Sequence, residues 1–212
     1  MYKEINNNGF EYVDLGLPSG TLWGTCNVGA SKPSDYGLYF QWGDTNGYAK
    51  DQIGRESGQK KFEFDYSDYK WYLSGNAYND CLKFKKYKTT GSTLDLEDDA
   101  AHVNMGGDWH MPSPTQIQEL LDNTTNTWTS LNDVNGRLFT SKKDQSKSIF
   151  FPGANNAWDG SVRGIGGYGE VLSSMSSKKY IDSSQVLSFG TGGVSLNYSD
   201  RYYGCSVRGV IG

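Results

Sequence analysis

Residues 98–123, DDAAHVNMGGDWHMPSPTQIQELLDN, carry the clearest secondary-structure signal in the chain. Ser113 is a typical N-cap residue, Pro114 follows it at the first helical position, and Gln116 completes a capping box. The apolar residues that follow share one helical face: Ile117, Leu120 and Leu121. The pattern predicts a helix over 113–123 with one side against a core.

An acidic run, LDLEDDAAH, precedes this helix and permits two interpretations. Its carboxylates are Asp95, Glu97, Asp98 and Asp99. Such oxygens can ligate Ca²⁺, although the run lacks the alternating ligand positions and central glycine of an EF-hand loop. We favour the other interpretation, in which they cap and solubilise a helix leading into Ala100, because a helix N-terminus favours negative charge. Calcium binding by the run stays open.

The N-terminal part of the chain has strand and turn signals. Residues 10–30, FEYVDLGLPSGTLWGTCNVGA, predict two short strands around a turn at 18–20. Residues 34–43, SDYGLYFQWG, predict a short helix capped by Ser34 that ends near Gly43.

Residues 44–92 are polar, rich in tyrosine and without clear periodicity, which predicts long loops with room for one strand. A structureless insert of this length is unusual in a compact domain unless it is functional or has its own packing. Four aromatic residues can supply that packing: Tyr66, Tyr69, Trp71 and Tyr72.

From Trp128 onward the pattern changes to strands, and Asn135-Gly136 is a hairpin turn signal. Five segments predict strands: RLFTS (137–141), SIFFPG (148–153), VLSFG (186–190), GVSLN (193–197) and GCSVRGVI (204–211). Residues 153–185 are rich in Gly, Ser and Asn and predict loops. The order of elements is that of an α+β fold with irregular connections.

Composition excludes several classes of protein. The chain has 20 Lys and Arg against 24 Asp and Glu, and its one dense basic run, over 83–88, is typical of a solvated surface. Nucleic-acid binding usually needs a broad basic face, so we expect no nucleic-acid partner. No stretch approaches the ~18 apolar residues of a membrane helix. The first residues lack the apolar segment of a signal peptide, so we expect no direct membrane insertion, while prior removal of a leader stays open.

No linker or fixed-period repeat divides the 212 residues. We therefore expect a single domain over 1–212, with the first ten or so residues as a flexible lead-in. The cysteines Cys26, Cys81 and Cys205 are too few and too scattered for a disulfide framework, which favours free, mostly buried thiols.

The sequence offers no recognised catalytic motif. His102 and His110 lie in HVNMGGDWH, but no Cys or carboxylate cluster adds zinc ligands at a recognised spacing, so we expect structural hydrogen bonds from both. A GxSxG elbow, a P-loop and a dinucleotide-binding glycine fingerprint are all missing. We therefore predict that the protein is not an enzyme and has no catalytic residue and no cofactor; a metal site stays open.

Four segments together resemble a known family: YVDLGLPSGTLWGTCNVGA (12–30), DYGLYFQWGDT (35–45), residues 98–123, and RYYGCSVRGV (201–210). They are similar to the Fibrobacter succinogenes major paralogous domain, a family abundant in Bacteroidetes and related to the C-type-lectin-like and formylglycine-generating-enzyme-like folds. The resemblance covers most of residues 11–210 and is weakest between about 45 and 90. The chain departs from the family pattern at His110, Cys205 and Gly209, where Arg, Phe and Pro are usual.

The resemblance implies a C-type-lectin-like α+β fold with two helices, short antiparallel sheets and long irregular loops. In that fold the first and last strands pair near each other, and the loops and late strands present a binding face. Tyr202 and Tyr203, which match the family block, are expected to serve core packing more than contact, and Arg208 to pair internally with a carboxylate or a carbonyl.

Variable proteins of diversity-generating retroelements use the same fold, with a C-terminal variable region in which Asn-type codons diversify into Tyr, Asp, Ser and Gly. Residues 155–201 are rich in these types, which also make up antibody paratopes. We therefore predict a non-enzymatic display protein of a gut-type bacterium or a phage, with a binding face over about 153–201 for a protein or glycan ligand on a cell surface. The cell surface or a phage particle is the suspected location. The candidate contact residues are Asn155, Asn156, Trp158, Asp159, Arg163, Tyr168, Glu170, Asn197, Tyr198 and Asp200.

Two alternatives stay open. The first is an oxidoreductase of the formylglycine-generating type, a branch that uses two closely spaced cysteines near the C-terminal end, where this chain has only Cys205. The second is a surface adhesion module that binds glycan or protein through Trp158 and neighbouring polar loops.

Overall fold

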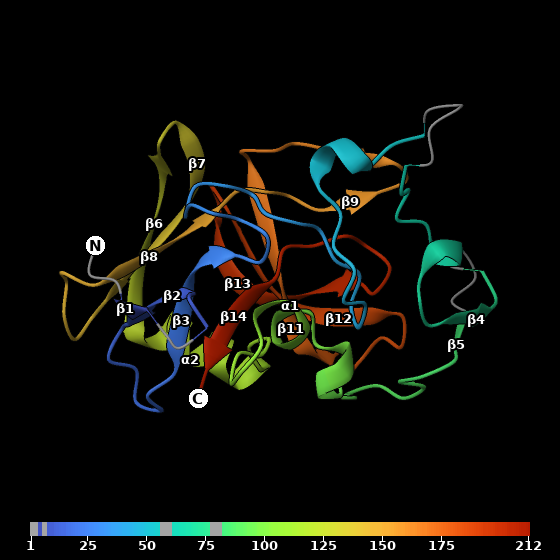
Figure 1. Ribbon diagram of the computed structural model, residues 1–212, viewed down its shortest axis with the longest axis horizontal. Coiled ribbons are helices and arrows are strands. Elements are labelled where there is room, and N and C mark those ends of the chain that lie inside the picture. The colour runs from blue at the N-terminus through green and yellow to red at the C-terminus, as the bar shows by residue number, and fades with distance from the viewer. Residues whose placement is uncertain (1–3, 6–7, 56–60, 77–81) are drawn as a thin grey trace.

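The computed structural model describes residues 4–5, 8–55, 61–76 and 82–212, so Cys81 lies outside the described residues. Within them the chain forms mostly antiparallel sheets with two helices, α1 (Ala100–Met105) and α2 (Pro114–Asn123), which confirms the α+β class (Figure 1). The strands are β1 (Glu4–Ile5), β2 (Glu11–Asp14), β3 (Leu22–Asn27), β4 (Tyr72–Ser74), β5 (Lys83–Phe84), β6 (Thr124–Leu131), β7 (Val134–Ser141), β8 (Ser148–Pro152), β9 (Ala157–Trp158), β10 (Ser161–Val162), β11 (Tyr168–Ser176), β12 (Ser183–Gly190), β13 (Gly193–Asp200) and β14 (Arg208–Ile211). Short 3-10 turns occupy Lys50–Gln52, Tyr66–Asp68 and Leu96–Asp98.

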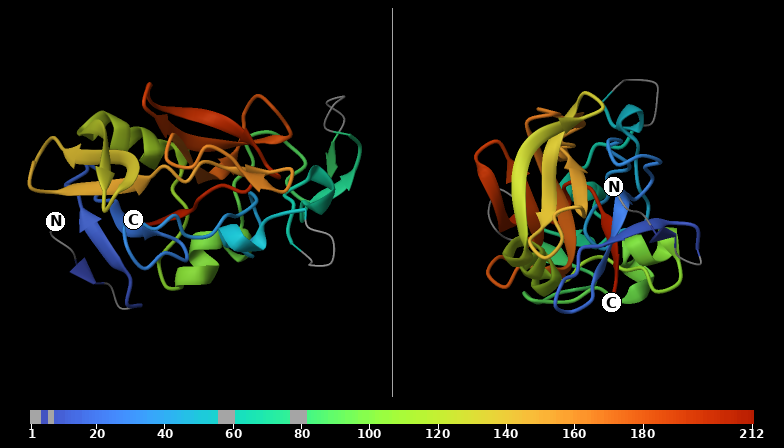
Figure 2. Two further views of the ribbon diagram at one scale, coloured as in Figure 1. Left: turned by 90° about the horizontal axis from the view of Figure 1, so that it is seen from above. Right: turned by 90° about the vertical axis from the view of Figure 1, so that its left-hand side faces the viewer.

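The first and last strands share one sheet, with the order β1-β2-β3-β14. In it Val210 of β14 lies opposite Trp23 of β3, so the chain closes beside its own beginning, as predicted (Figure 2). Near the N-terminus, Glu4 and Ile5 pair with Tyr12 and Glu11 as a short edge strand.

Both helices begin at the caps that the sequence indicates. The hydroxyl of Ser113 accepts a hydrogen bond from the Gln116 backbone N–H at 3.2 Å, and the Gln116 side chain accepts one from the Ser113 N–H at 2.9 Å. Asp99 caps α1 by accepting from the His102 N–H at 2.9 Å. The capping interpretation of the acidic run is therefore confirmed for Asp99.

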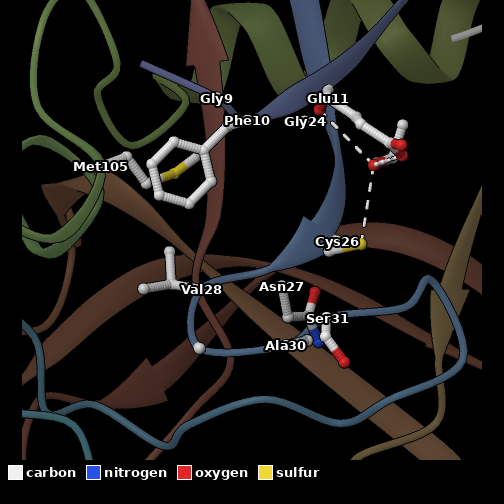
Figure 3. Close-up of a pocket in the computed structure, with 12 residues that line it drawn as sticks. Gly9, Phe10, Glu11, Gly24, Cys26, Asn27, Val28, Ala30, Ser31 and Met105 are labelled. Atoms are coloured by element: carbon white, nitrogen blue, oxygen red, sulfur yellow. Dashed lines mark hydrogen bonds between the residues drawn. The ribbon is translucent and has the colours of Figure 1, made fainter. Parts of the chain in front are cut away.

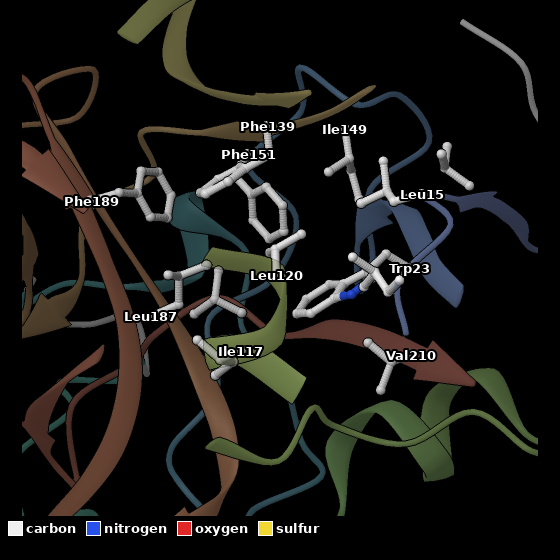
Figure 4. Close-up of a cluster of buried hydrophobic side chains, with 13 residues drawn as sticks. Leu15, Trp23, Ile117, Leu120, Phe139, Ile149, Phe151, Leu187, Phe189 and Val210 are labelled. Carbon is white, nitrogen blue, oxygen red and sulfur yellow. The ribbon is translucent and has the colours of Figure 1, made fainter. Parts of the chain in front are cut away.

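One apolar core joins the sheets to α2 (Figure 4). Phe151 of β8 lies at its centre, with ring centroids 5.9 Å from Trp23, 5.2 Å from Phe139 and 6.0 Å from Phe189. Ile117 of α2 is fully buried in the same cluster. These edge-on aromatic contacts fix β3, β7, β8 and β12 against one another.

Arg208 is fully buried beside this core and pairs internally with carbonyl groups, as predicted. Its guanidinium donates to the backbone oxygens of Gly24 at 2.9 Å and Phe150 at 3.1 Å, and to the side-chain oxygen of Asn27 at 3.0 Å. Burial lowers its pKa to about 9. Nearby Gly209 lies close to two side chains: a Cβ there would lie 2.6 Å from the Met105 sulfur and 2.9 Å from the Trp109 ring, so these side chains would have to shift.

The helix predicted over 34–43 does not form. The segment is extended: the Tyr39 N–H donates to Tyr48 O and the Phe40 N–H to Cys205 O, both at 2.9 Å. Gly37 has a φ of +74°, and a Cβ at that position would lie 2.6 Å from Val28 O. Long-range backbone pairing and this left-handed glycine override the local N-cap signal.

The predicted turn at Asn135-Gly136 is displaced. Asn132 and Asp133, with φ values of 50° and 63°, form the turn between β6 and β7. Gly136 instead lies inside β7, where a Cβ would lie 2.9 Å from Pro152 Cα. Gly136 therefore allows the close packing of neighbouring strands and does not form a turn.

The loops predicted over 153–185 are wrong for the nine residues of β11, which pairs with β12 in the sheet β11-β12-β13. In the 44–92 segment, the described residues form the small β4–β5 hairpin at the end of the molecule opposite the β6–β7 hairpin (Figure 1). Its predicted aromatic packing is confirmed, because Tyr69 is buried with Leu82 and Phe84, and Tyr66, Trp71 and Tyr72 pack against this cluster.

Candidate functional site

Three of the candidate contact residues, Trp158, Asp159 and Asp200, line one cavity of about 190 Å³. We call it the Trp158 pocket; its full lining is Phe64, Asp65, Tyr66, Trp158, Asp159, Asp182, Asp200, Tyr202 and Tyr203. These residues come from four separate parts of the chain: the turn before β4, the end of β9, the start of β12 and the end of β13.

Backbone hydrogen bonds bring these segments together. Ala157 and Gly204 exchange two bonds of 2.7 and 2.8 Å, which sets Trp158 beside Tyr203. The Gly160 N–H donates to Glu63 O at 2.6 Å and so fixes the Phe64 segment next to the β9 turn. The pocket therefore rests on paired backbone and not on free loops.

Aromatic rings form one side of the pocket. Trp158 stacks on Tyr203 with centroids 5.8 Å apart and an interplanar angle of 21°. Tyr202 meets Tyr203 edge-on at 4.9 Å and Tyr66 at 6.3 Å. Tyr202 and Tyr203 thus pack, as predicted, and also line the cavity.

Four carboxylates complete the lining: Asp65, Asp159, Asp182 and Asp200. Burial, and then the charge of Asp182, raise the pKa of Asp200, while hydrogen bonds from Tyr202 and Tyr203 oppose the rise. The Asp200 carboxylate is therefore partly desolvated, which disfavours its charged form.

Two arginines lie at the rim. Arg55 pairs with Asp159 and, at 2.9 Å, with Glu63. The guanidinium carbon of Arg163 lies 4.9 Å from the centroid of the Trp158 ring. Arg163 is itself exposed, so the candidate residue Arg163 lies at the surface beside the pocket.

Glu170 is a candidate contact residue that the structure buries, with 5% of its surface exposed. Its carboxylate accepts hydrogen bonds from Asn156 Nδ2 at 2.9 Å, Tyr168 OH at 2.8 Å and Ser199 Oγ at 2.8 Å. Ser199 precedes Asp200, and Asn156 is two residues before Trp158. Direct surface contact by Glu170 is thus excluded in this conformation; the carboxylate instead holds the two segments that carry the pocket.

Asn155 lies at the edge of this network with a φ of 59°, and its side chain accepts from the Asn156 N–H at 2.7 Å. Asn155, Asn156 and Tyr168 are half-buried. They are therefore partly accessible, although two of them are committed to Glu170.

Asn197 and Tyr198 form a separate exposed patch on β13. Tyr198 is 41% exposed and packs edge-on against Tyr180, 45% exposed, at 5.7 Å. This patch lies on β13, the strand that ends at Asp200 of the Trp158 pocket.

The residue pattern gave no signal for Asp65, Tyr66 or Asp182. The first two are more than 90 positions before Trp158, and only the tertiary fold brings them close. Asp182 lies in the segment whose composition predicts a loop, although it directly precedes β12.

A second cavity, of about 260 Å³, lies between β3, the start of β2 and α1 (Figure 3). Phe10, Glu11, Cys26 and Met105 line it. The thiol of Cys26 lies 3.5 Å from the Thr25 hydroxyl, which is 3.3 Å from a Glu11 carboxylate oxygen. None of the ten candidate contact residues lines this cavity.

The other described thiol, Cys205, is fully buried. Burial, and then the charge of Glu170, raise the pKa of Cys205 well above its usual value. A thiolate is the form that attacks electrophiles and binds metals, and this environment disfavours it.

The histidines make the predicted structural contacts, since Nδ1 of His102 pairs with Trp109 O at 3.0 Å and Nδ1 of His110 with Met111 O at 2.9 Å. In the acidic run, carboxylate oxygens of Asp95, Glu97 and Asp98 lie within 4.8 Å of one another. The Lys86 ammonium pairs with all three, at 2.6, 3.1 and 2.6 Å. Lysine thus supplies the positive charge in the place that a cation would take.

No family model, curated protein or solved structure matches the chain. A functional argument therefore has to start from the site itself. Among the described residues, no helix has the length and apolar character needed to cross a membrane.

Proposed function

We propose that this protein is a non-enzymatic ligand-binding protein with a C-type-lectin-like fold, which displays the face over about 153–201 to a protein or glycan on a cell surface. The observation that carries the proposal is the convergence of Trp158, Asp159 and Asp200 on one cavity. Their neighbours Tyr202 and Tyr203 enlarge its aromatic side.

The chemistry of the face supports binding. Trp and Tyr offer large, rigid contact areas that lose little entropy on binding, and Asn, Ser and Asp add adaptable hydrogen bonds. The buried Glu170 bonds hold the pocket segments before a ligand arrives, and such preorganisation lowers the entropic cost of association. The exposed Tyr198 and Tyr180 pair extends the contact area beyond the pocket.

We further propose that the face is the variable region of a diversity-generating retroelement in a gut-type bacterium or a phage. The supporting observation is the density of Asn, Tyr, Ser, Asp and Gly over 155–201. The coding DNA tests this part: we expect a near-copy of its last ~150 bases that differs mainly at adenines, beside a reverse transcriptase gene. Without such a template, this part of the proposal fails.

No specific observation favours the oxidoreductase alternative, and the burial of Cys205 weighs against thiolate chemistry at that residue. The adhesion alternative would use the same face, so it differs from display only in the identity of the ligand.

Binding to protein and glycan arrays tests the proposal. We compare the wild type with the double variant Trp158→Ala/Tyr198→Ala, and use Val103→Ala as the control because Val103 is an apolar residue of α1 that is 51% exposed. We expect the double variant to lose the array signals and the control to keep them. Signals that survive in the double variant would contradict the proposed face.

A further inference from the structure

The geometry points to a cationic ligand group, a guanidinium or an ammonium on a protein partner, as the occupant of the Trp158 pocket. This inference rests on the proposed function, because it names the class of ligand that the same face accepts. Charge, ring geometry, hydrogen-bonding capacity and size carry it.

The charge of the lining is one-sided. Four of the nine lining residues are aspartates and none is Lys or Arg. Arg55 pairs with Asp159 at the rim. In the part of the chain that the structure describes, the other three carboxylates of the lining form no ion pair. A concave site lined by negative charges concentrates an electric field that attracts cations.

The lining contains aromatic rings that can attract a cation. A guanidinium or ammonium within about 6 Å of an aromatic centroid is attracted by the ring quadrupole. The chain's own Arg163 already lies in this way over Trp158, at 4.9 Å. The protein's own arginines therefore make the two contacts that we expect of a ligand. Arg163 places a guanidinium over the Trp158 ring, and Arg55 pairs a guanidinium with Asp159.

Hydrogen-bonding capacity separates a cation from a neutral sugar. Ionised carboxylates only accept hydrogen bonds, and guanidinium and ammonium groups only donate them. The lining has the acceptor oxygens of four carboxylates but only three hydroxyl donors, those of Tyr66, Tyr202 and Tyr203. A sugar hydroxyl needs acceptors and donors together, so the free capacity of the pocket fits a cation better.

The size of the pocket also fits. A cavity of ~150 Å³ holds a benzene molecule, which has six heavy atoms. The Trp158 pocket, at about 190 Å³, can therefore hold the four heavy atoms of a guanidinium and part of its aliphatic stem.

Two small probes of equal shape test the inference. Nα-acetyl-arginine amide carries the cation, and Nα-acetyl-citrulline amide replaces it with a neutral urea. Binding is followed by the NMR shift of the Trp158 indole N–H, which the spectrum of Trp158→Phe assigns. We expect the arginine probe to bind at least tenfold more tightly than the citrulline probe, which is 1.4 kcal/mol at 25 °C.

The variants Asp200→Asn and Asp182→Asn should each weaken the arginine probe several-fold. The control Asp122→Asn removes one negative charge from exposed residue 122 on α2 and should leave the affinity unchanged. Equal affinity for both probes, or no shift of Trp158 with either, overturns the cation inference. A neutral glycan from the array that depends on Trp158 overturns it too, but leaves the proposed function standing; array signals indifferent to Trp158 and Tyr198 overturn the proposed function itself.

Discussion

Replacing Glu170 by alanine, and separately by glutamine, separates the supporting role of this carboxylate from a role in contact. The alanine variant removes the acceptor for Asn156, Tyr168 and Ser199. Hydrogen bonds to a charged group contribute about 1.5–3 kcal/mol each, so three contribute about 4.5–9 kcal/mol. Removing a buried charge also removes its desolvation penalty of several kcal/mol, and we expect a net loss of about 2–4 kcal/mol in the free energy of unfolding.

The glutamine variant should lose much less. Its amide oxygen can take the position of the carboxylate oxygen that accepts from Asn156 and Ser199. Its amide nitrogen would then face the Tyr168 hydroxyl, which can accept from it while donating to the Ser188 hydroxyl 2.5 Å away. Asn156, Ser199 and Tyr168 each keep a partner, so we expect a loss below about 1 kcal/mol.

Urea unfolding followed by tryptophan fluorescence measures both losses, and the Trp158 indole N–H shift reports whether the folded pocket has moved. We expect Glu170→Ala to move that resonance and Glu170→Gln to leave it nearly in place. An alanine variant as stable as the wild type, with an unmoved Trp158 resonance, would refute the reasoning that Glu170 holds the pocket segments. Equal losses in the two variants would show that the negative charge, and not the acceptor geometry, matters.

Two further changes test the electrostatics and the packing. Burial raises the pKa of Asp200, so the folded state loses stability as the pH rises through that pKa. The variant Asp200→Asn should escape this loss and be more stable than the wild type at pH 7. At about pH 3 both side chains are neutral, so the variant should have no advantage there. Thermal unfolding at the two pH values checks this, and an equal difference at both would contradict it. Gly136→Ala should lower the free energy of unfolding by about 1–3 kcal/mol, because the new Cβ would lie 2.9 Å from Pro152 Cα. Gly192→Ala is the control, because a Cβ there has nothing within 4 Å, and it should change this free energy by less than about 0.5 kcal/mol. The urea unfolding used for the Glu170 variants measures both.

Local signals in the sequence predicted the elements that local interactions stabilise. The α2 helix follows from Ser113 and Gln116, whose capping bonds span three residues. The segment 34–43 could not be predicted in this way, because its backbone partners, Tyr48 and Cys205, are fixed only by the tertiary fold. Gly136 allows close packing against the neighbouring strand, but together with Asn135 it has the sequence of a hairpin turn. The sequence alone does not show which residues lie beside Gly136, so it could not separate these two roles.

The candidate site was predictable in its residue types and not in its arrangement. The composition of residues 155–201 indicates Trp158 and Asp200 as contact residues, and the fold brings them to one pocket. The same composition indicates Glu170, but this residue lies on β11, a strand whose Ser- and Gly-containing sequence resembles a loop. The contribution of Asp65 and Tyr66 depends on contacts across the fold that no local pattern encodes.

A crystal structure of the protein with the ligand found on the arrays tests the central claim most directly. We expect atoms of the ligand within about 4 Å of Trp158 and Asp200, the distance of ordinary van der Waals and hydrogen-bonded contact. A ligand seated elsewhere, for example in the cavity beside Cys26, with the Trp158 pocket unchanged, would contradict the account.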